Sequence, residues 1–308
     1  MKAALLDRFG GPEVLHYGDV PDPVAAAGEV VVDVHAATVN AADWKFRAGD
    51  YARHANVKFP QNPGRDFSGV VSAVGDGADL KIGDAVFGVI AAGKEGTYCE
   101  KIAIKADLIG KKPDALSHIN AAALALTGLT AINSIEDTLK LQRGETILIQ
   151  GGAGGVAGFG IQFANYLGAK VITTTSAANV DYVKSLGADQ VIDYNAQDFM
   201  RVVSGCDAVF DTVGGDVAKQ SFAVLKPGGR AAFIASGMEA PKSDRSDVTG
   251  LRPPVPRSRK AMERIAELFV AGAIRPPEVK LYKLSQAAEA HRLSQSRHFR
   301  GKLVFQVC

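Results

Sequence analysis

The sequence predicts an α/β protein that combines a doubly wound parallel sheet with a smaller, β-rich domain, and three observations predict it. At residues 146–157, TILIQGGAGGVA, an apolar β-branched run passes through four glycines in five positions into an apolar helical pattern. Strand-like and helix-like segments then alternate, which is typical of parallel sheets. Before this stretch, short apolar runs separated by glycines indicate a largely antiparallel β domain.

The glycine-rich turn predicts a dinucleotide site, because it stands between a strand and a helix. We expect Gly152 to take the backbone out of the strand, Gly154 to leave room for a pyrophosphate, and Ala157 to let helix and strand pack closely. The free N–H groups and the dipole of the helix would bind the anion. A glycine cluster alone also marks ordinary loops, so a ligand-free sheet is the alternative. The expected backbone contacts are Gly152, Ala153, Gly154, Gly155 and Val156.

The segments after this turn repeat the strand and helix pattern. The predicted strands are Lys170 to Thr175, Gln190 to Asp193, Ala208 to Asp211 and Ala231 to Ile234. The predicted crossover helices are Val180 to Leu186, Ala196 to Val203 and Val217 to Leu225. The proline-rich stretch Met238 to Lys260 is predicted to be a mobile loop.

The pattern divides the chain into three parts. Residues 1–116 form the β-rich domain, in which helical periodicity is nearly absent before Ser117, a plausible N-cap. Residues 117–272 form the nucleotide-binding domain. Residues 273–308 are expected to return to the first domain and to close a cleft between the two, where ligands usually bind.

Composition sets limits on function. The 308 residues suffice for two cores, and 47% hydrophobic with 22% charged residues is ordinary for a globular protein. A net charge of +2 gives no argument for nucleic acid or an anionic membrane. Three widely spaced cysteines suit a reducing compartment, and no signal peptide or membrane span is recognised. We therefore expect a cytoplasmic protein.

The order of motifs resembles the medium-chain dehydrogenase/reductase superfamily, and within it the quinone oxidoreductase or zeta-crystallin-like branch. This resemblance implies a GroES-like catalytic domain, a Rossmann domain and a homodimer, although three prolines near residue 254 weaken the edge strand used for dimerisation. The chain departs from the family pattern at Ala157, which is often glycine in relatives, and at residues 251–257, where relatives tend to have a strand. The matching segments are VNAADWKFRAGDY, PGRDFSGVVSAVG, KIGDAVFG, GTYCEKIAI, AAALALTGLTA, ILIQGGAGGVAG, VKSLGADQVIDY, VFDTVGG, LKPGGR and RGKLVFQV.

The resemblance also implies chemistry without a metal. Zinc alcohol dehydrogenases of the superfamily carry a cysteine in the segment aligned with residues 40–43, and Gly-His-Glu where this chain reads Gly64-Arg65-Asp66. The cysteines and histidines here have no ligand spacing either. Without a Lewis acid, conjugated acceptors are favoured, because hydride addition to a quinone or an enone spreads the negative charge.

The cofactor is expected to be NADPH. An NAD-specific sheet places a carboxylate after the second strand, whereas this chain has Thr175 and Ser176 there and its first acid is Asp181. Ser176 and Asn179 can donate to a 2′-phosphate, although they could instead form a helix N-cap. In related quinone reductases, the positions that match Ser176 and Tyr194 contact NADPH.

Family matches place further residues beside the nicotinamide and substrate. Asn40 could donate to a carbonyl oxygen or form a turn, Lys45 could reach the ribose or an enolate, and Asp43 would orient its neighbours. Tyr51 is a possible proton donor or pocket wall, and Trp44 is expected to pack. The remaining contacts expected with the cofactor are Thr127 or, as the better match, Thr130, and the main-chain groups of Val213, Gly214, Ile234 and Ala235.

These features predict an NADPH-dependent, zinc-independent reductase of quinones or α,β-unsaturated carbonyl compounds. The alternatives are an enoyl-thioester reductase, which would need a basic groove for its carrier, and a non-catalytic, crystallin-like protein that keeps NADPH for stability. The expected partner is a small-molecule substrate.

Overall fold

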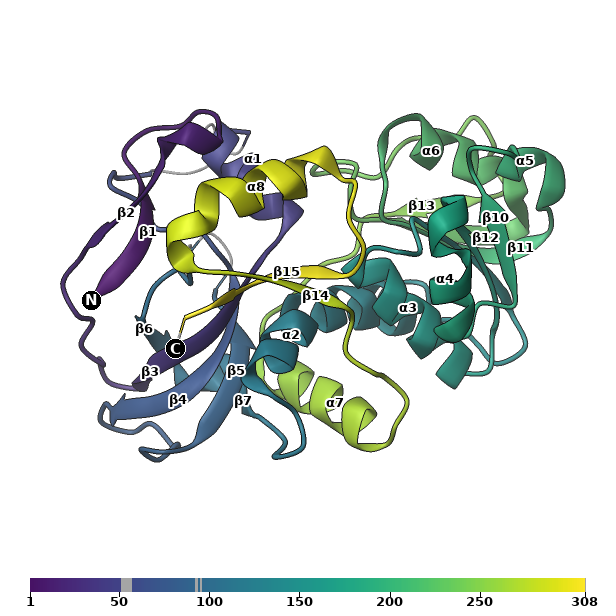
Figure 1. The fold of residues 1–308 in the computed structure, drawn as a ribbon. Helices are drawn as coiled ribbons and strands as arrows, with labels where there is room; N and C mark the ends of the chain where they lie inside the picture. The colour runs from purple at the N-terminus through teal and green to yellow at the C-terminus, as the bar shows by residue number, and fades with distance from the viewer. Residues whose placement is uncertain (51–56, 92–93, 95, 308) are drawn as a thin grey trace. The chain divides into compact units, whose positions relative to one another are not determined.

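The computed structural model describes residues 1–50, 57–91, 94 and 96–307, and the chain forms two compact units (Figure 1). Unit 1 comprises Met1–Leu126, Pro256–Ala271 and Arg275–Cys308, and unit 2 comprises Thr127–Val255 and Gly272–Ile274. Among the described residues, the structure contains no helix that is long and apolar enough to cross a bilayer.

Unit 2 is built on a six-stranded sheet with the order β10-β9-β8-β11-β12-β13, in which every neighbouring pair is parallel. This is the doubly wound order, so the predicted fold class is confirmed. The strands are β8 (Thr146–Gln150), β9 (Lys170–Thr175), β10 (Gln190–Asp193), β11 (Cys206–Asp211), β12 (Leu225–Phe233) and β13 (Thr249–Leu251). The helices are η4 (Asn133–Thr138), α3 (Gly155–Tyr166), η5 (Ala177–Asn179), α4 (Val180–Ser185), α5 (Phe199–Val202), α6 (Gly215–Gln220) and η6 (Ser221–Val224).

Helices cover both faces of this sheet. On one face, Leu148 and Val209 share a core with Phe199 of α5 and Phe222 of η6. On the other face, α3 approaches so closely that a Cβ at Gly160 would lie 3.4 Å from the Phe210 ring. Burial on both faces explains the apolar runs of the central strands β8 and β11.

The proline-rich stretch is more ordered than predicted. Within residues 238–260, β13 pairs parallel with β12, and Arg252 anchors the following segment by donating to the carbonyls of Phe233 (3.0 Å) and Gly237 (2.8 Å). The prediction of one long loop was therefore wrong. Three strand residues before a proline pair are too few to give a recognisable pattern.

Unit 1 has a two-stranded antiparallel sheet, β1-β2, and a seven-stranded sheet. Six strands of the larger sheet follow the order β14-β15-β3-β4-β5-β7, and the seventh, β6, pairs with β3. All pairs in the larger sheet are antiparallel except β14-β15. The strands are β1 (Lys2–Leu6), β2 (Leu15–Asp19), β3 (Glu29–Val39), β4 (Asp66–Val74), β5 (Ala85–Val89), β6 (Lys101–Lys105), β7 (Ile109–Lys111), β14 (Val279–Tyr282) and β15 (Lys302–Gln306). The helices are η1 (Pro12–Val14), α1 (Ala41–Ala48), η3 (Ala106–Leu108), α2 (His118–Ile132), α7 (Arg259–Val270), η7 (Leu284–Gln286) and α8 (Ala287–Ser296), of which α2 continues into unit 2.

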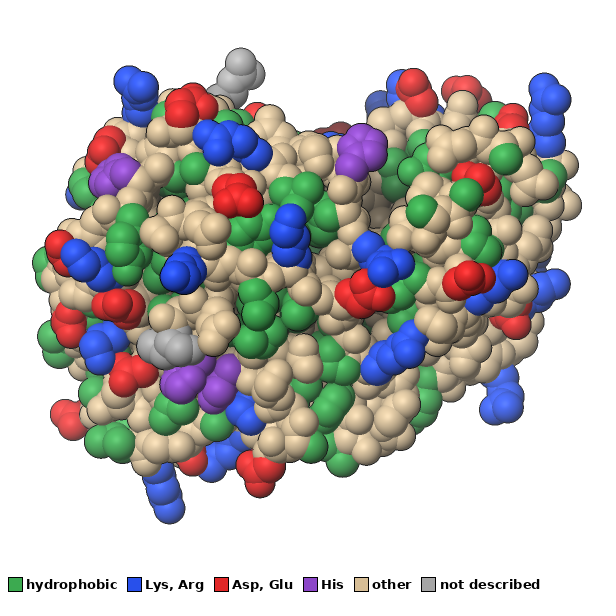
Figure 2. All heavy atoms as spheres, in the orientation of Figure 1, with side chains coloured by type: hydrophobic (Ala, Val, Ile, Leu, Met, Phe, Trp, Pro, Cys, Tyr) green, Lys and Arg blue, Asp and Glu red, His purple; other side chains and the backbone are tan. Residues whose placement is uncertain are grey.

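The C-terminal segment belongs to unit 1, because β15 pairs antiparallel with β3 and Leu303 lies opposite Val39. Helix α7 also belongs to unit 1, whereas the predicted boundary at residue 272 placed it in the nucleotide domain. The reason is its packing on β7, where a Cβ at Gly110 would lie 2.7 Å from the Met262 Cβ. Figure 2 shows basic and acidic side chains interspersed over the described residues of one face.

Candidate functional site

The turn between β8 and α3 is made by a different glycine from the one expected. Gly151, with φ of +77°, leaves the strand, and Gly152 does not adopt a left-handed conformation. Gly152 is needed for packing instead, because a Cβ there would lie 2.3 Å from Thr173 Oγ1 on β9. Its amide donates to the carbonyl of Thr174 over 2.9 Å, which holds the turn against the sheet.

The start of α3 fits a pyrophosphate. Gly154 is the N-cap, and a Cβ built on it would meet only the Gly151 carbonyl oxygen, at 3.4 Å, so the main chain is open to an approaching group. The first N–H groups of a helix have no partner within it, and the helix dipole favours an anion there. Ala157, in the first turn, is fully buried.

The predicted ribose contacts lie at the carboxyl ends of β9 and β10. Ser176 follows β9, and Asn179 Nδ2 donates to its Oγ over 3.1 Å. Tyr194, which is 56% exposed, follows β10, and its amide donates to the carbonyl of Thr175 over 3.1 Å. Within the described part of the chain, neither Ser176 nor Asn179 makes a side-chain capping hydrogen bond. The hydroxyl proton of Ser176 and the second amide proton of Asn179 are thus available to an anion.

The other predicted backbone contacts, residues 213–214 and 234–235, follow the carboxyl ends of β11 and β12. The carboxylate of Asp211, at the end of β11, accepts hydrogen bonds from the amides of Val213 (3.2 Å) and Gly214 (3.0 Å). Burial raises the pKa of Asp211. Gly214 has φ of +82°, and a Cβ there would lie 2.9 Å from the Ala235 carbonyl oxygen, so residues 213–214 and 234–235 are neighbours. Thr127 and Thr130 are buried on α2.

In unit 1, Asn40 is the N-cap of α1, a helix that the sequence analysis missed. Its amide nitrogen donates to Asp66 Oδ1 (2.8 Å) and lies 3.4 Å from the Thr38 carbonyl, while its Oδ1 accepts from Lys302 Nζ over 2.6 Å. The amide protons therefore point at protein acceptors. The prediction that Asn40 donates to a substrate carbonyl is not what this arrangement provides, and its turn-forming alternative is closer to the observed role.

For Asp43 the sequence predicts a role in orienting its neighbours. Asp43 is fully buried, and its carboxylate accepts hydrogen bonds from the main-chain N–H of Asn40 (2.8 Å), the Tyr98 hydroxyl (3.0 Å) and Arg65 Nη1 (3.1 Å). Burial raises the pKa of Asp43, and the Arg65 charge opposes that shift. Lys45 lies with Nζ 5.7 Å from the centre of the buried Trp44 ring. Tyr51, expected to be either a proton donor or a pocket wall, lies outside the described residues.

The residues that replace the superfamily's zinc ligands form part of a buried charge network. Arg65 pairs with Asp43, and Asp66 Oδ1 accepts from Thr38 Oγ1 over 2.8 Å as well as from Asn40. Lys302 is 4% exposed, and burial lowers its pKa. Two cations and two carboxylates thus share one site. Among the described residues, no three His, Cys, Asp or Glu side chains are grouped as metal ligands would be.

Sequence reasoning missed Lys302, Tyr98 and His291. The burial of Tyr98 raises its pKa, and its hydroxyl lies 3.2 Å from Nε2 of His291. The signal for Lys302 was available, since a lysine opening the apolar strand KLVF is unusual.

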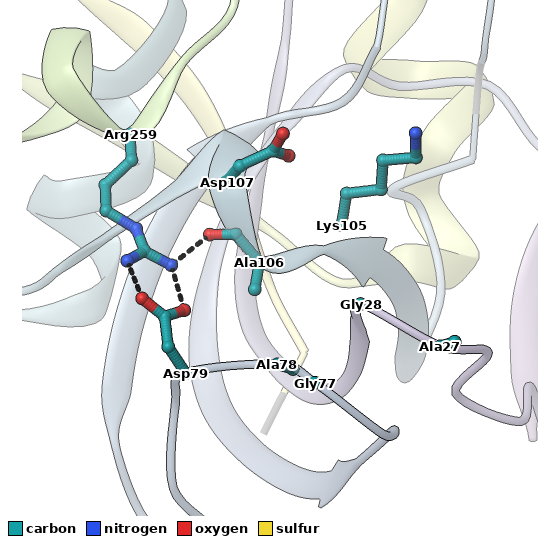
Figure 3. Close-up of a pocket in the computed structure, with 9 residues that line it drawn as sticks. All are labelled: Ala27, Gly28, Gly77, Ala78, Asp79, Lys105, Ala106, Asp107 and Arg259. Carbon is teal, nitrogen blue, oxygen red and sulfur yellow. Dashed lines mark hydrogen bonds and ion pairs between the residues drawn. The ribbon is translucent and has the colours of Figure 1, made fainter.

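A cavity of about 440 Å³ lies elsewhere in unit 1, and none of the predicted site residues lines it. Figure 3 shows Arg259 at its edge, with its guanidinium directed to Asp79 and to the Ala106 carbonyl. The cavity is lined by Ala27, Gly28, Gly77, Ala78, Asp79, Lys105, Ala106, Asp107 and Arg259.

The doubly wound unit with its open glycine turn and the antiparallel unit with its buried charges have the architecture of a two-domain oxidoreductase. Residues 26–114 match the alcohol dehydrogenase GroES-like domain, and residues 186–305 match the zinc-binding dehydrogenase family. The chain belongs to the medium-chain dehydrogenase/reductase superfamily, as its resemblance implied.

Its relatives include several oxidoreductases. The mouse mitochondrial NAD(P)H oxidoreductase RTN4IP1 is 30% identical over 100% of this chain and 89% of its own. The Arabidopsis thaliana chloroplastic NADPH-dependent alkenal/one oxidoreductase is 29% identical over 99% of this chain and 79% of its own. The structure of the Coxiella burnetii quinone oxidoreductase is 35% identical, with a TM-score of 0.92 over 100% of this chain and 99% of that one.

Proposed function

We propose that this protein is an NADPH-dependent reductase of quinones or α,β-unsaturated carbonyl compounds that needs no metal. Membership of the superfamily supports an oxidoreductase, and its relatives include an alkenal/one oxidoreductase and a quinone oxidoreductase. The observation that carries the choice of cofactor is the set of uncharged donors, Ser176, Asn179 and Tyr194, beyond β9 and β10.

The residues present fit the nucleotide. Gly154 and the first turn of α3 would hold the pyrophosphate, and Ser176 with Asn179 would bind the 2′-phosphate. When bound, reduced nicotinamide supplies a hydride. Residues 213–214 and 234–235, beside one another at the adjoining strand ends, would line the part of the site next to that ring.

A conjugated acceptor suits the residues that stand at the zinc-ligand positions of the superfamily. At the positions matching zinc ligands, this chain has Arg65 and Asp66, which are engaged with Asp43, Thr38 and Asn40. A site without a Lewis acid can still stabilise an enolate or a hydroquinone anion, because the charge is spread and hydrogen-bond donors suffice.

The cofactor assignment predicts the effect of Ser176→Asp. A carboxylate at this position would repel the 2′-phosphate and accept from ribose hydroxyls, so we expect the ratio of kcat/KM for NADPH to that for NADH to exceed 10 in the wild type and to fall at least about 30-fold in the variant, roughly 2 kcal/mol. Steady-state oxidation of each nucleotide with a quinone panel and an enone panel measures it.

Ser185→Asp is the matched control, because Ser185 is exposed on α4 and its hydroxyl donates to the Tyr182 carbonyl. Its ratio should equal that of the wild type. Equal or better use of NADH by the wild type would refute the cofactor assignment. NADPH binding without turnover of any acceptor would refute the reductase and favour a non-catalytic role.

A further inference from the structure

A fully enclosed lysine on β15 is not explained by the fold alone. Lys302 opens an apolar strand and is 4% exposed. Burying an ammonium group costs several kcal/mol unless it is paired and hydrogen-bonded, and an apolar side chain of similar size often serves stability as well or better.

The partners of Lys302 point to Asn40. Nζ donates to Asn40 Oδ1 over 2.6 Å and to the Val39 carbonyl over 3.1 Å. The charges of Asp66 and Asp43 raise the pKa of Lys302, against the larger lowering by burial. The lysine thus contacts the residue that precedes α1, and the charges of two carboxylates favour its protonated form.

These contacts leave the Asn40 amide one orientation. An ammonium group only donates and a carboxylate only accepts, so the amide oxygen faces Lys302 and the nitrogen faces Asp66. The backbone of Asn40 then donates to Asp43, which fixes the first turn of α1. Rotating the amide would break both side-chain hydrogen bonds.

We propose that Lys302 is a positioning residue for the reductase reaction, acting through Asn40 to set the first turn of α1, which carries Asp43 and Lys45. This inference rests on the proposed function for its kinetic readout. The proposal requires that the effects of Lys302 and Asn40 on the reaction are coupled rather than independent.

A double-mutant cycle with Lys302→Met and Asn40→Ala tests whether the two residues act together. Each single variant should lower kcat with the preferred acceptor at least tenfold, and the double variant should lower it no further than Asn40→Ala alone. The NADPH dissociation constant should change less than twofold, because the proposed contacts with the pyrophosphate and the 2′-phosphate lie in unit 2. Lys280→Met is the control, since Lys280 is exposed on the neighbouring strand β14, and it should leave kcat unchanged.

Multiplicative losses in the double variant would overturn the proposal. If Lys302→Met does not fold, Lys302→Gln, which keeps an N–H donor, enters the same cycle. If the wild type turns over no acceptor, the proposed function fails separately, and the crystal structure of the Lys302 variant decides the positioning role. An altered Asn40 amide and a displaced first turn of α1 would support that role, and an unchanged Asn40 would overturn it.

Discussion

His291 links the stability of unit 1 to pH through one imidazole. It is fully enclosed on α8, Nε2 lies 3.2 Å from the Tyr98 hydroxyl, and Nδ1 has no partner among the described residues. Burial, aided by the Arg47 charge, lowers the pKa of His291 to about 3. The imidazole is therefore neutral in the folded protein at neutral pH.

Acidification should destabilise the wild type more than His291→Gln. The folded pKa lies below the unfolded value of about 6.5, so the contribution of His291 is complete above pH 6.5 and is lost as the pH falls toward 3. The full loss is on the order of 5 kcal/mol. Urea unfolding at pH 7, 5.5 and 4.5 measures it, and the variant should show the shallower decline. His298→Gln, at an exposed site, should follow the wild type, and parallel curves for all three proteins would contradict the assignment.

Individual side chains were predictable where chemistry depends on the local chain. Ser176 and Asn179 follow a recognisable strand, so their place at its carboxyl end could be inferred from sequence. The role of Asn40 could not, because its partner Lys302 lies 262 positions away on β15. A buried network is specified by pairing between strands, and a single sequence gives no direct measure of that pairing.

At the scale of elements, two glycines of the turn before α3 have different roles, one in packing and one in ligand binding. Gly152→Ala should lower the free energy of unfolding by about 1 to 3 kcal/mol, because its Cβ would lie 2.3 Å from Thr173 Oγ1. Gly154→Ala has space for its Cβ but would block a pyrophosphate, so we expect NADPH affinity to fall at least tenfold with a smaller change in stability. Denaturant titration and calorimetry measure the two effects. Equal effects of both substitutions on binding and stability would contradict this division of roles.

The central strands β8 and β11 were predictable because burial on both faces leaves the apolar runs ILI and AVF. The bounds of β9 and β10 agree with those predicted from the alternation of strand-like and helix-like segments. Helix α1 was missed because it is only eight residues long, begins two positions after the end of β3, and buries Asp43 and Arg47 beside Trp44 and Phe46, so its sequence lacks a clean apolar face. Its beginning depends on the cap formed by Asn40 and Asp43, and its end on Gly49 in the left-handed conformation.

For the whole molecule, the doubly wound unit and the antiparallel unit were foreseen, and their exact bounds were not. Unit 1 gathers three separate parts of the chain, so no single compositional break marks its limits. Helix α7 has an amphipathic sequence that would suit either unit. Its assignment depends on contacts such as those of Arg259 with Asp79 and with the Ile109 carbonyl.

The division into two units predicts where the nucleotide stabilises the chain. All the proposed contacts with adenosine 2′-phosphate and pyrophosphate groups lie in unit 2, so 2′,5′-ADP, which lacks the nicotinamide half, should protect residues 151–158 and 174–180 from hydrogen exchange. At 100 times its dissociation constant, the ligand should stabilise this unit by about 2.7 kcal/mol. The strands at residues 85–111 of unit 1 should exchange at the same rate as without the ligand.

Adenosine 5′-monophosphate, without the 2′-phosphate, is the control and should protect residues 174–180 more weakly at the same concentration. Equal protection by the two nucleotides would contradict a 2′-phosphate site at Ser176 and Asn179, because only that phosphate distinguishes them.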